Sequence, residues 1–133
     1  MQNFDILTLQ EVFYTLNDRK ESLIQYAAQN GFPFSAKSCF PKMHSPFVVD
    51  GALLTLSRFP IVEQEYQPYE YGVFSYSTAN KGILYTKIKI QEEYILLFNT
   101  HTNASYVSPD FQEGKASIET RVFQFEQVRH LAN

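Results

Sequence analysis

The stretch Asp5–Phe13 reads Asp-Ile-Leu-Thr-Leu-Gln-Glu-Val-Phe and joins a short apolar run to a polar end. Residues Ile6–Leu9 are mainly apolar, which is typical of a buried strand, and Gln10 and Glu11 follow directly. Proteins that mix strands and helices place ligands at the carboxyl ends of their strands. A carboxylate there suits a hard cation such as Mg²⁺, which takes few protein ligands and keeps several waters. A solvated glutamate just past a strand is the competing interpretation, and this stretch alone leaves both open.

The composition predicts one folded domain without an electrostatic footprint for nucleic acid. The chain has 133 residues, of which 44% are hydrophobic, enough for one domain with a real core. Its formal net charge of -3 argues against a partner that needs phosphate neutralisation. The single cysteine, Cys39, cannot form an internal disulfide, so cysteine usage leaves the compartment open. No apolar run reaches the about 18 residues that a membrane-spanning helix needs.

Residues 18–30 are predicted to form a helix. Asp18 stands at the N-cap with Glu21 three residues on, as in a capping box, and Gly31 fits a left-handed C-cap. We expect its apolar face to pack on the first strand. That face carries Leu23, Ile24, Ala27 and Ala28.

A second helix is predicted over residues 117–131, after a loop at 103–116. Ser117 is a candidate N-cap, and Arg129 and His130 in the last turn suit the helix dipole. One face has the apolar stripe of a helix that packs against a core. This stripe consists of Ile118, Val122, Phe125 and Val128.

The remaining apolar segments predict strands. Their expected positions are residues 34–38, 50–57, 61–66, 83–90 and 94–100. Gln91–Glu93 is short enough for a hairpin loop, and residues 67–80 indicate an exposed loop. Tyr94–Phe98 is continuously apolar, as in a strand covered on both faces, and Asn99–His101 forms its polar end. This order of strands and helices predicts a layered α/β fold of the α+β type.

Four short motifs follow one another along the chain. They are Gln10–Glu11 after the first strand, Gly51–Ile61 with its Ser-Arg-Phe-Pro-Ile end, Asn99–His101, and Arg121–Gln124 in the last helix. In this order the chain resembles the endonuclease/exonuclease/phosphatase superfamily, the fold of pancreatic-type deoxyribonuclease. The resemblance implies an α/β/β/α sandwich, of which residues 1–133 would form an incomplete domain. The first strand and the C-terminal catalytic segment of the family would then be missing.

Further motifs are most similar to the Mg²⁺-dependent neutral sphingomyelinases within that superfamily. Asp50 precedes Gly51 as in that branch, and Asn80–Tyr85 resembles its Asp-Lys-Gly-(apolar)-x-Tyr segment. Thr100–Ala104 is similar to its Thr-His-Leu-Gln-Ala. The chain departs from the pattern in having Asn80 for Asp, Thr102 for Leu and Asn103 for Gln.

The resemblance implies a Mg²⁺-dependent phosphodiesterase that hydrolyses sphingomyelin to ceramide and phosphocholine. Glu11 would be the metal ligand, and His101, as the catalytic residue, would hydrogen-bond a non-bridging phosphate oxygen. Asn103 and Lys81 would help to place the phosphate or the leaving group. Asp50 is a further candidate for the substrate site, and a plain turn residue before Gly51 is the alternative.

A lipid substrate implies contact with a membrane surface, where exposed aromatic rings are favourable. The alternative is that most of these rings pack onto the sheet. The resemblance leads us to expect a membrane-associated or secreted protein, whereas the sequence leaves the oligomeric state open. The candidate rings are Phe40, Phe47, Tyr66, Tyr69, Tyr71, Phe74 and Tyr76.

Two other functions stay open at this point. A nuclease or inositol-phosphate phosphatase of the same superfamily would cleave those substrates in preference to sphingomyelin, against which the acidic balance argues. A non-catalytic binding protein, an inactive fragment of the domain, would be folded and soluble without hydrolase activity. Exposed strand edges argue against this second alternative, because unpaired edges promote aggregation.

Overall fold

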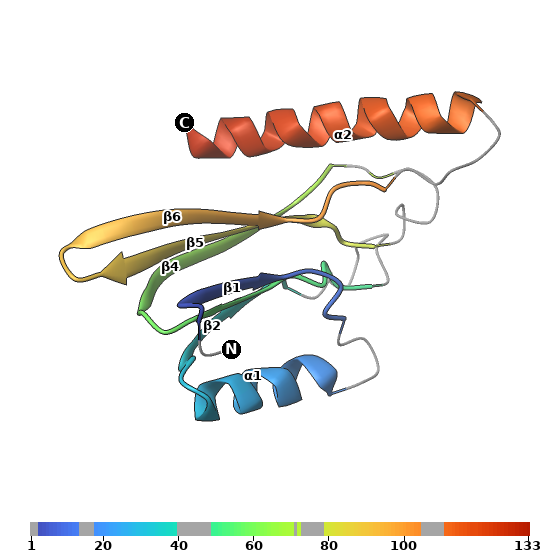
Figure 1. The fold of residues 1–133 in the computed structure, drawn as a ribbon. Coiled ribbons are helices and arrows are strands. Elements are labelled where there is room, and N and C mark those ends of the chain that lie inside the picture. Colours follow the sequence, from blue (N-terminus) through green and yellow to red (C-terminus); the bar gives the residue numbers. More distant parts are fainter. Residues whose placement is uncertain (1–2, 14–17, 40–48, 71, 73–78, 105–110) are drawn as a thin grey trace.

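The computed structural model describes residues 3–13, 18–39, 49–70, 72, 79–104 and 111–133. The elements lie in four layers, in the order α1, a three-stranded sheet, a second three-stranded sheet and α2 (Figure 1). All strand pairings within the two sheets are antiparallel. The predicted α/β/β/α sandwich of mixed strands and helices is therefore confirmed.

The first sheet has the order β1-β3-β2 and carries α1 on its outer face. Its strands are β1 (Ile6–Leu9), β3 (Leu54–Ser57) and β2 (Phe34–Lys37). Leu54 and Leu56 of β3 pack with Ala27 of α1 and with Phe32. The central strand β3 is buried along its whole length because it is covered on both faces.

Helix α1 spans Arg19–Gln29, close to the predicted residues 18–30, and Gly31 has the expected left-handed φ of 89°. The predicted capping box is wrong, because the side chain of Asp18 makes no cap hydrogen bond. Glu21 pairs instead with Lys37 at the end of β2. This pairing joins α1 to the sheet beneath it.

Strand β3 begins at Leu54, whereas the sequence predicted a strand from residue 50. Ala52 has a φ of 55°, which breaks the extended conformation just before the strand. Leu53 turns its side chain to a second core, between the sheets, with Ala36 of β2 and Leu84 of the second sheet. Residues 50–53 therefore form a turn that links the two cores.

The second sheet has the order β4-β5-β6 and lies between the first sheet and α2. Its strands are β4 (Ile61–Pro68), β5 (Gly82–Ile90) and β6 (Glu93–Thr100). The predicted hairpin joins β5 to β6, with Ile90 opposite Glu93 and Gln91 at a φ of 55°. Since β6 runs back from this turn, its polar end returns to the start of β5, where Ile83 faces Thr100.

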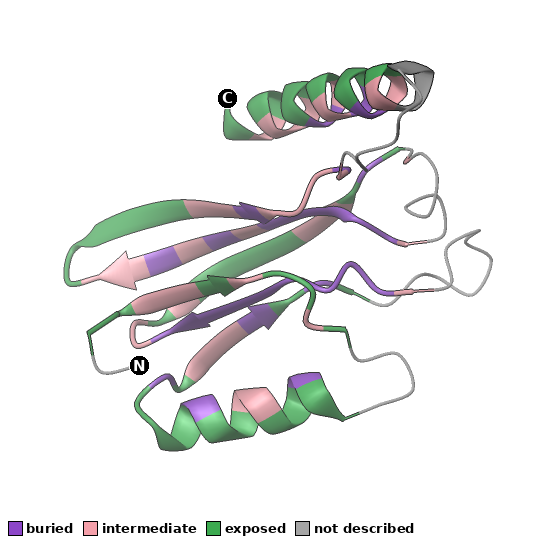
Figure 2. Cartoon of the chain, turned by 45° about the vertical axis from the view of Figure 1, so that its right-hand side comes forward, coloured by how far each residue is buried: buried purple, intermediate pink, exposed green. Residues whose placement is uncertain are grey.

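The prediction that Tyr94–Phe98 is covered on both faces is wrong. Tyr94, Ile95 and Leu96 are 51%, 41% and 54% exposed. Figure 2 shows the turn end of the β5–β6 hairpin in the colour of exposed residues. Among the described strands β6 forms the edge of its sheet. The apolar character of Tyr94–Leu96 therefore does not correspond to burial in the structure.

Helix α2 spans Phe111–Ala132, so it begins within the predicted loop and Ser117 lies inside it. The predicted apolar stripe does not face the core, because Ile118, Val122 and Phe125 are 54%, 58% and 57% exposed. The buried face of the helix is polar instead and consists of Ser117, Thr120 and Gln124. Within the described residues no helix combines the length and apolar character of a membrane span.

Candidate active site

The polar ends of β1 and β6 meet, although they belong to different sheets. The amide of Gln10 donates a hydrogen bond of 2.9 Å to Oδ1 of Asn99. The Asn99 amide donates in turn to the carbonyl oxygens of Leu9, at 3.3 Å, and Leu54, at 3.1 Å. Asn99 is 2% exposed, so it acts as a buried connector that places the residues after β1 beside those after β6.

Glu11 extends from this junction toward solvent. Its side chain is 66% exposed, and its Oε1 atom lies 3.9 Å from Nε2 of His101. The backbone of Glu11 has a φ of 60°, and the next residue, Val12, donates its N–H to the carbonyl oxygen of Ala52 at 3.0 Å. Such a left-handed conformation is uncommon outside glycine, so the surrounding contacts must hold it.

Lys81 brings a cation to the same group of residues. It is 7% exposed, and its Nζ donates to the carbonyl oxygen of Thr102 at 3.4 Å. Burial lowers the pKa of Lys81 to about 8, against the raising effect of Glu11. The lysine is therefore still mainly protonated at neutral pH, and it offers a poorly hydrated positive charge.

The pKa of His101 is lowered below its ordinary value of 6.5. Partial burial is the main cause, the positive charge of Lys81 adds to it, and the carboxylate of Glu11 opposes both. His101 is consequently neutral at pH 7 and can donate one hydrogen bond while its other ring nitrogen accepts one.

Tyr69 connects the segments that carry Lys81 and His101. Its backbone N–H donates to the carbonyl oxygen of Lys81 at 2.8 Å, and its hydroxyl lies 2.5 Å from Oγ1 of Thr100. The Thr100 hydroxyl donates to the carbonyl oxygen of Gly82 at 2.8 Å, so Tyr69 is the donor in the shared bond. Burial raises the pKa of Tyr69, which keeps that hydroxyl proton in place.

Helix α2 holds Asn103 through both of its backbone groups. The N–H of Asn103 donates to Oε1 of Gln124 at 2.8 Å, and its carbonyl oxygen accepts a bond from Nη1 of Arg121 at 3.3 Å. The Asn103 side-chain amide donates to the carbonyl oxygen of Ala104 and to Oγ of Ser117. The Arg-x-x-Gln motif of α2 thus fixes the chain directly after His101 and Thr102.

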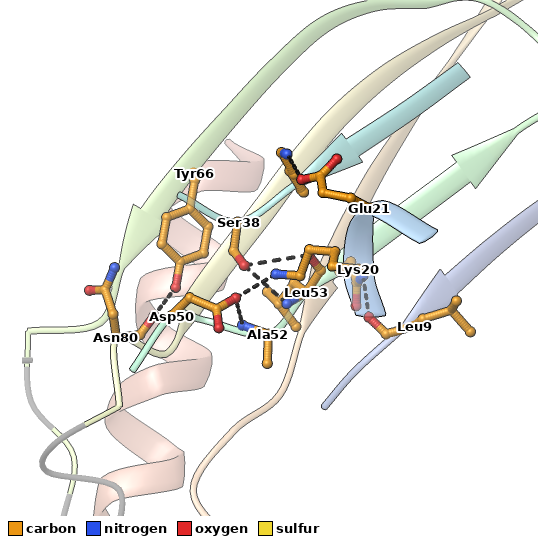
Figure 3. A network of polar contacts seen from close by, with 11 residues as sticks. Leu9, Lys20, Glu21, Ser38, Asp50, Ala52, Leu53, Tyr66 and Asn80 are labelled. Carbon is orange, nitrogen blue, oxygen red and sulfur yellow. Dashed lines mark hydrogen bonds and ion pairs between the residues drawn. The ribbon is translucent and has the colours of Figure 1, made fainter. Parts of the chain in front are cut away.

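Asp50 is fully buried and forms an ion pair with Lys20 of α1. Figure 3 shows its carboxylate between the Lys20 ammonium group and the backbone N–H of Ala52, which donates to it at 3.1 Å. Asp50 therefore contacts groups in the protein interior. They make Asp50 part of the support for the turn at residues 50–53.

Of the site residues expected from the sequence, the structure brings together Glu11, Lys81 and His101. Asn103 is adjacent, with its side-chain amide bonded inside the fold, and Asp50 lies in the buried network of Figure 3. The sequence did not reveal the roles of Tyr69 and Lys20. Neither belongs to a motif, so only the contacts identify them. Asn99, in contrast, begins the recognisable motif Asn99–His101.

The aromatic residues proposed to contact a membrane divide into two groups. Tyr69 is 3% exposed, and Tyr66 packs with the core between the sheets. These two rings thus follow the alternative of packing onto the sheet. The other candidates, Phe40, Phe47, Tyr71, Phe74 and Tyr76, lie outside the residues that the structure describes.

The donor set fits a hard cation bound by one carboxylate. Glu11 is exposed and its carboxylate can take a ligand, whereas the Asn99 amide is occupied on both its oxygen and its nitrogen. Over the described ranges there is no cluster of three His, Cys, Asp or Glu side chains. A dense all-protein cage is thus not formed by these residues, and Mg²⁺ with few protein ligands and several waters suits them better.

Comparison with known sequences gives two relatives, and no family model matches the chain. A sphingomyelinase of Dictyostelium discoideum is 41% identical over 115 residues, which are 80% of this chain and 25% of that protein. Sphingomyelinase C of Bacillus cereus is 31% identical over 81 residues, 60% of this chain and 23% of that protein. The chain therefore spans about a quarter of the length of the relatives it matches.

Solved structures share the fold over nearly the whole chain. Sphingomyelinase C from Streptomyces griseocarneus has a TM-score of 0.84 at 20% identity. The match covers 98% of the present chain and 46% of the sphingomyelinase C chain. A beta toxin of Staphylococcus aureus solved with bound magnesium ions has a TM-score of 0.80 at 20% identity. This match covers 98% of the present chain and 47% of the toxin chain. Sequence and fold agree, and the chain is a relative of the sphingomyelinases within the endonuclease/exonuclease/phosphatase superfamily.

Proposed function

We propose that this chain is part of a Mg²⁺-dependent phosphodiesterase that hydrolyses sphingomyelin to ceramide and phosphocholine. The observation that carries the proposal is the meeting of Glu11, Lys81 and His101 at the ends of strands from both sheets. The relatives named sphingomyelinases support the choice of substrate. They favour a sphingomyelinase over a nuclease or an inositol-phosphate phosphatase.

In this proposal the residues divide the work of binding a phosphodiester. Glu11 would hold Mg²⁺, which when bound would supply Lewis-acid polarisation of a phosphoryl oxygen. Neutral His101 donates a hydrogen bond to a non-bridging oxygen, and the protonated Lys81 supplies a charge-assisted bond to the same group. The negative charge that develops in the transition state strengthens both contacts.

The backbone supports keep these groups in one arrangement. Tyr69 ties the Lys81 segment to Thr100, and Arg121 with Gln124 fixes Asn103 just beyond His101. Asn103 would contribute to phosphate placement through this loop. We assign the base that deprotonates the attacking water to the part of the sphingomyelinase length that this chain does not span, which makes residues 1–133 an incomplete domain.

The substrate implies a membrane-associated or secreted protein that meets a lipid surface. The test is phosphocholine release from sphingomyelin vesicles by the native gene product, with Mg²⁺ and with EDTA. Glu11→Gln and His101→Ala should each lower the rate at least about a hundredfold, since each removes a contact to the transition state. Glu63→Gln is the matched control, because Glu63 is an exposed carboxylate on β4.

Unchanged turnover in Glu11→Gln would refute the metal role of Glu11. Faster cleavage of DNA, RNA or inositol phosphates than of sphingomyelin would replace the proposed substrate by that of another branch. Native product without hydrolase activity on any of these substrates would favour the binding-protein alternative.

A further inference from the structure

A buried ion pair lies beside the turn at residues 50–53, and the proposed chemistry uses neither of its partners. Lys20 of α1 and Asp50 both have fully buried side chains. Burial lowers the pKa of Lys20, and the hydrogen bond and charge of Asp50 oppose this shift. Placing two charges in the interior is costly, so the pair suggests a role that an apolar contact could not fill.

The pair is connected to Glu11 through the backbone of Ala52. Asp50 Oδ2 accepts the N–H of Ala52 at 3.1 Å, and Ala52 has a left-handed φ of 55°. The carbonyl oxygen of Ala52 accepts the N–H of Val12 at 3.0 Å, and this bond fixes the peptide that leaves Glu11. Glu11 and Ala52 both have left-handed backbone conformations, and the hydrogen bond from Val12 to Ala52 links the two segments.

The same turn is held from the side that carries Lys81. A Cβ atom on Gly51 would overlap the Tyr66 hydroxyl and lie 2.7 Å from the carbonyl oxygen of Asn80. The Tyr66 hydroxyl donates to that carbonyl oxygen, directly before Lys81 (Figure 3). Leu53 is held in turn by Ser38, whose Oγ accepts the Leu53 N–H at 3.1 Å. The turn at residues 50–53 therefore lies between the segments that carry Glu11 and Lys81.

We propose that Asp50 is a positioning residue: its carboxylate holds Ala52 in the conformation that directs Glu11 into the site, and the Lys20 ammonium group neutralises this buried carboxylate. The proposal rests on the proposed function only in taking Glu11 as the Mg²⁺ ligand. The link from Asp50 through Ala52 to Val12 follows from the hydrogen bonds alone and does not depend on that assignment.

Two double variants of the 133-residue chain separate positioning from stability. Lys20→Met with Asp50→Asn removes both charges and keeps an oxygen that accepts the Ala52 N–H. Lys20→Met with Asp50→Leu removes the charges and that acceptor at similar volume. Because neither leaves an unpaired buried charge, both should fold, which circular dichroism and thermal unfolding check.

Amide hydrogen exchange and Mg²⁺ titration give the readouts. In the leucine double variant we expect exchange at Val12 and Ala52 to be at least about tenfold faster, with the amide of Ile88 in β5 unchanged. The Mg²⁺ dissociation constant should rise at least about tenfold toward that of Glu11→Gln. The asparagine double variant should stay within about threefold of the native chain in both measurements.

Equal protection at Val12 and equal Mg²⁺ affinity in the two double variants would overturn the proposal. If the native chain itself binds no Mg²⁺, the metal role of Glu11 fails, and exchange at Val12 alone decides the positioning role. If the leucine variant does not fold, Lys20→Met with Asp50→Ala replaces it. We expect the same loss of protection at Val12 in this variant. Protection at Val12 equal to that of the asparagine variant would overturn the proposal.

Discussion

The side-chain amide of Gln10 donates a 2.9 Å hydrogen bond to the buried side-chain oxygen of Asn99. These residues stand 89 positions apart in the chain. Gln10 follows β1, whereas Asn99 lies at the end of β6 in the other sheet. Asn99 also satisfies the carbonyl oxygens of Leu9 and Leu54. One amide side chain therefore fixes how the two sheets align at the proposed site.

Replacing Asn99 by leucine should destabilise the fold by about 2–5 kcal/mol. The change leaves the buried carbonyl oxygen of Leu54 and the part-buried one of Leu9 without this donor, and each such loss costs about 1–3 kcal/mol. Urea unfolding of the purified chain measures the effect. Gln64→Met is the control and should cost under about 1 kcal/mol because Gln64 is exposed on β4. Similar losses in the two variants would contradict the role given to Asn99.

Lys81→Met should stabilise the chain at pH 7, in a way that depends on pH. The pKa of Lys81 is about 8 in the folded chain and 10.5 when unperturbed. Between these two pH values the unfolded chain binds more protons than the folded chain, so the stability of the native chain rises as the pH increases from about 8 to about 10.5. Below about pH 8 the native chain bears the full cost of burying the protonated Lys81. We expect a gain of roughly 2–3 kcal/mol at pH 7, which disappears near pH 10.5.

Thermal unfolding across this pH range compares Lys81→Met with the native chain. Lys115→Met is the control, because the Lys115 side chain is 68% exposed. A gain that stays constant across the pH range would show that burial of charge is not its source. Loss of sphingomyelin hydrolysis in Lys81→Met, together with the gain in stability, would fit a lysine retained for binding phosphate.

Two glycine-to-alanine changes should have opposite signs. A Cβ atom on Gly82 would overlap the carbonyl oxygen of Gln67 and lie 2.7 Å from Cα of Pro68, so β4 and β5 would have to separate. We expect a loss of more than about 3 kcal/mol. Gly114 lies inside α2 with nothing within 4 Å of its added Cβ, and alanine there should stabilise by about 0.5–1 kcal/mol. Urea midpoints measure both, and equal shifts would disagree with this close packing.

Neighbouring substitutions in α2 test which face of the helix is buried. Gln124→Leu removes the acceptor for the buried N–H of Asn103 and should cost about 1–3 kcal/mol. Phe125→Ala should change stability by only about 0.5 kcal/mol because the ring is 57% exposed. If the apolar stripe expected from the sequence faced the core, Phe125→Ala would instead cost about 3–5 kcal/mol. Chemical denaturation of both variants decides between these orientations.

The sequence by itself determined the elements and their order. The alternation in Lys87–Ile90, the short loop at Gln91–Glu93 and the glycine after α1 are local signals, and the structure places a strand, a hairpin and a left-handed cap there. The motifs at Gln10–Glu11 and Asn99–His101 also identified where the proposed site lies. Local signals suffice for such features because backbone preferences act over a few residues.

Only the tertiary structure decided what each element faces. The apolar stripe of α2 and the residues Tyr94–Leu96 are exposed, because burial depends on which neighbour covers a surface and not on the pattern of the segment itself. The same holds for the pairs Gln10–Asn99 and Lys20–Asp50, whose partners are far apart in sequence. Hydrogen bonds between such distant residues exist only after the chain has folded, so no periodicity or motif within one segment could predict them.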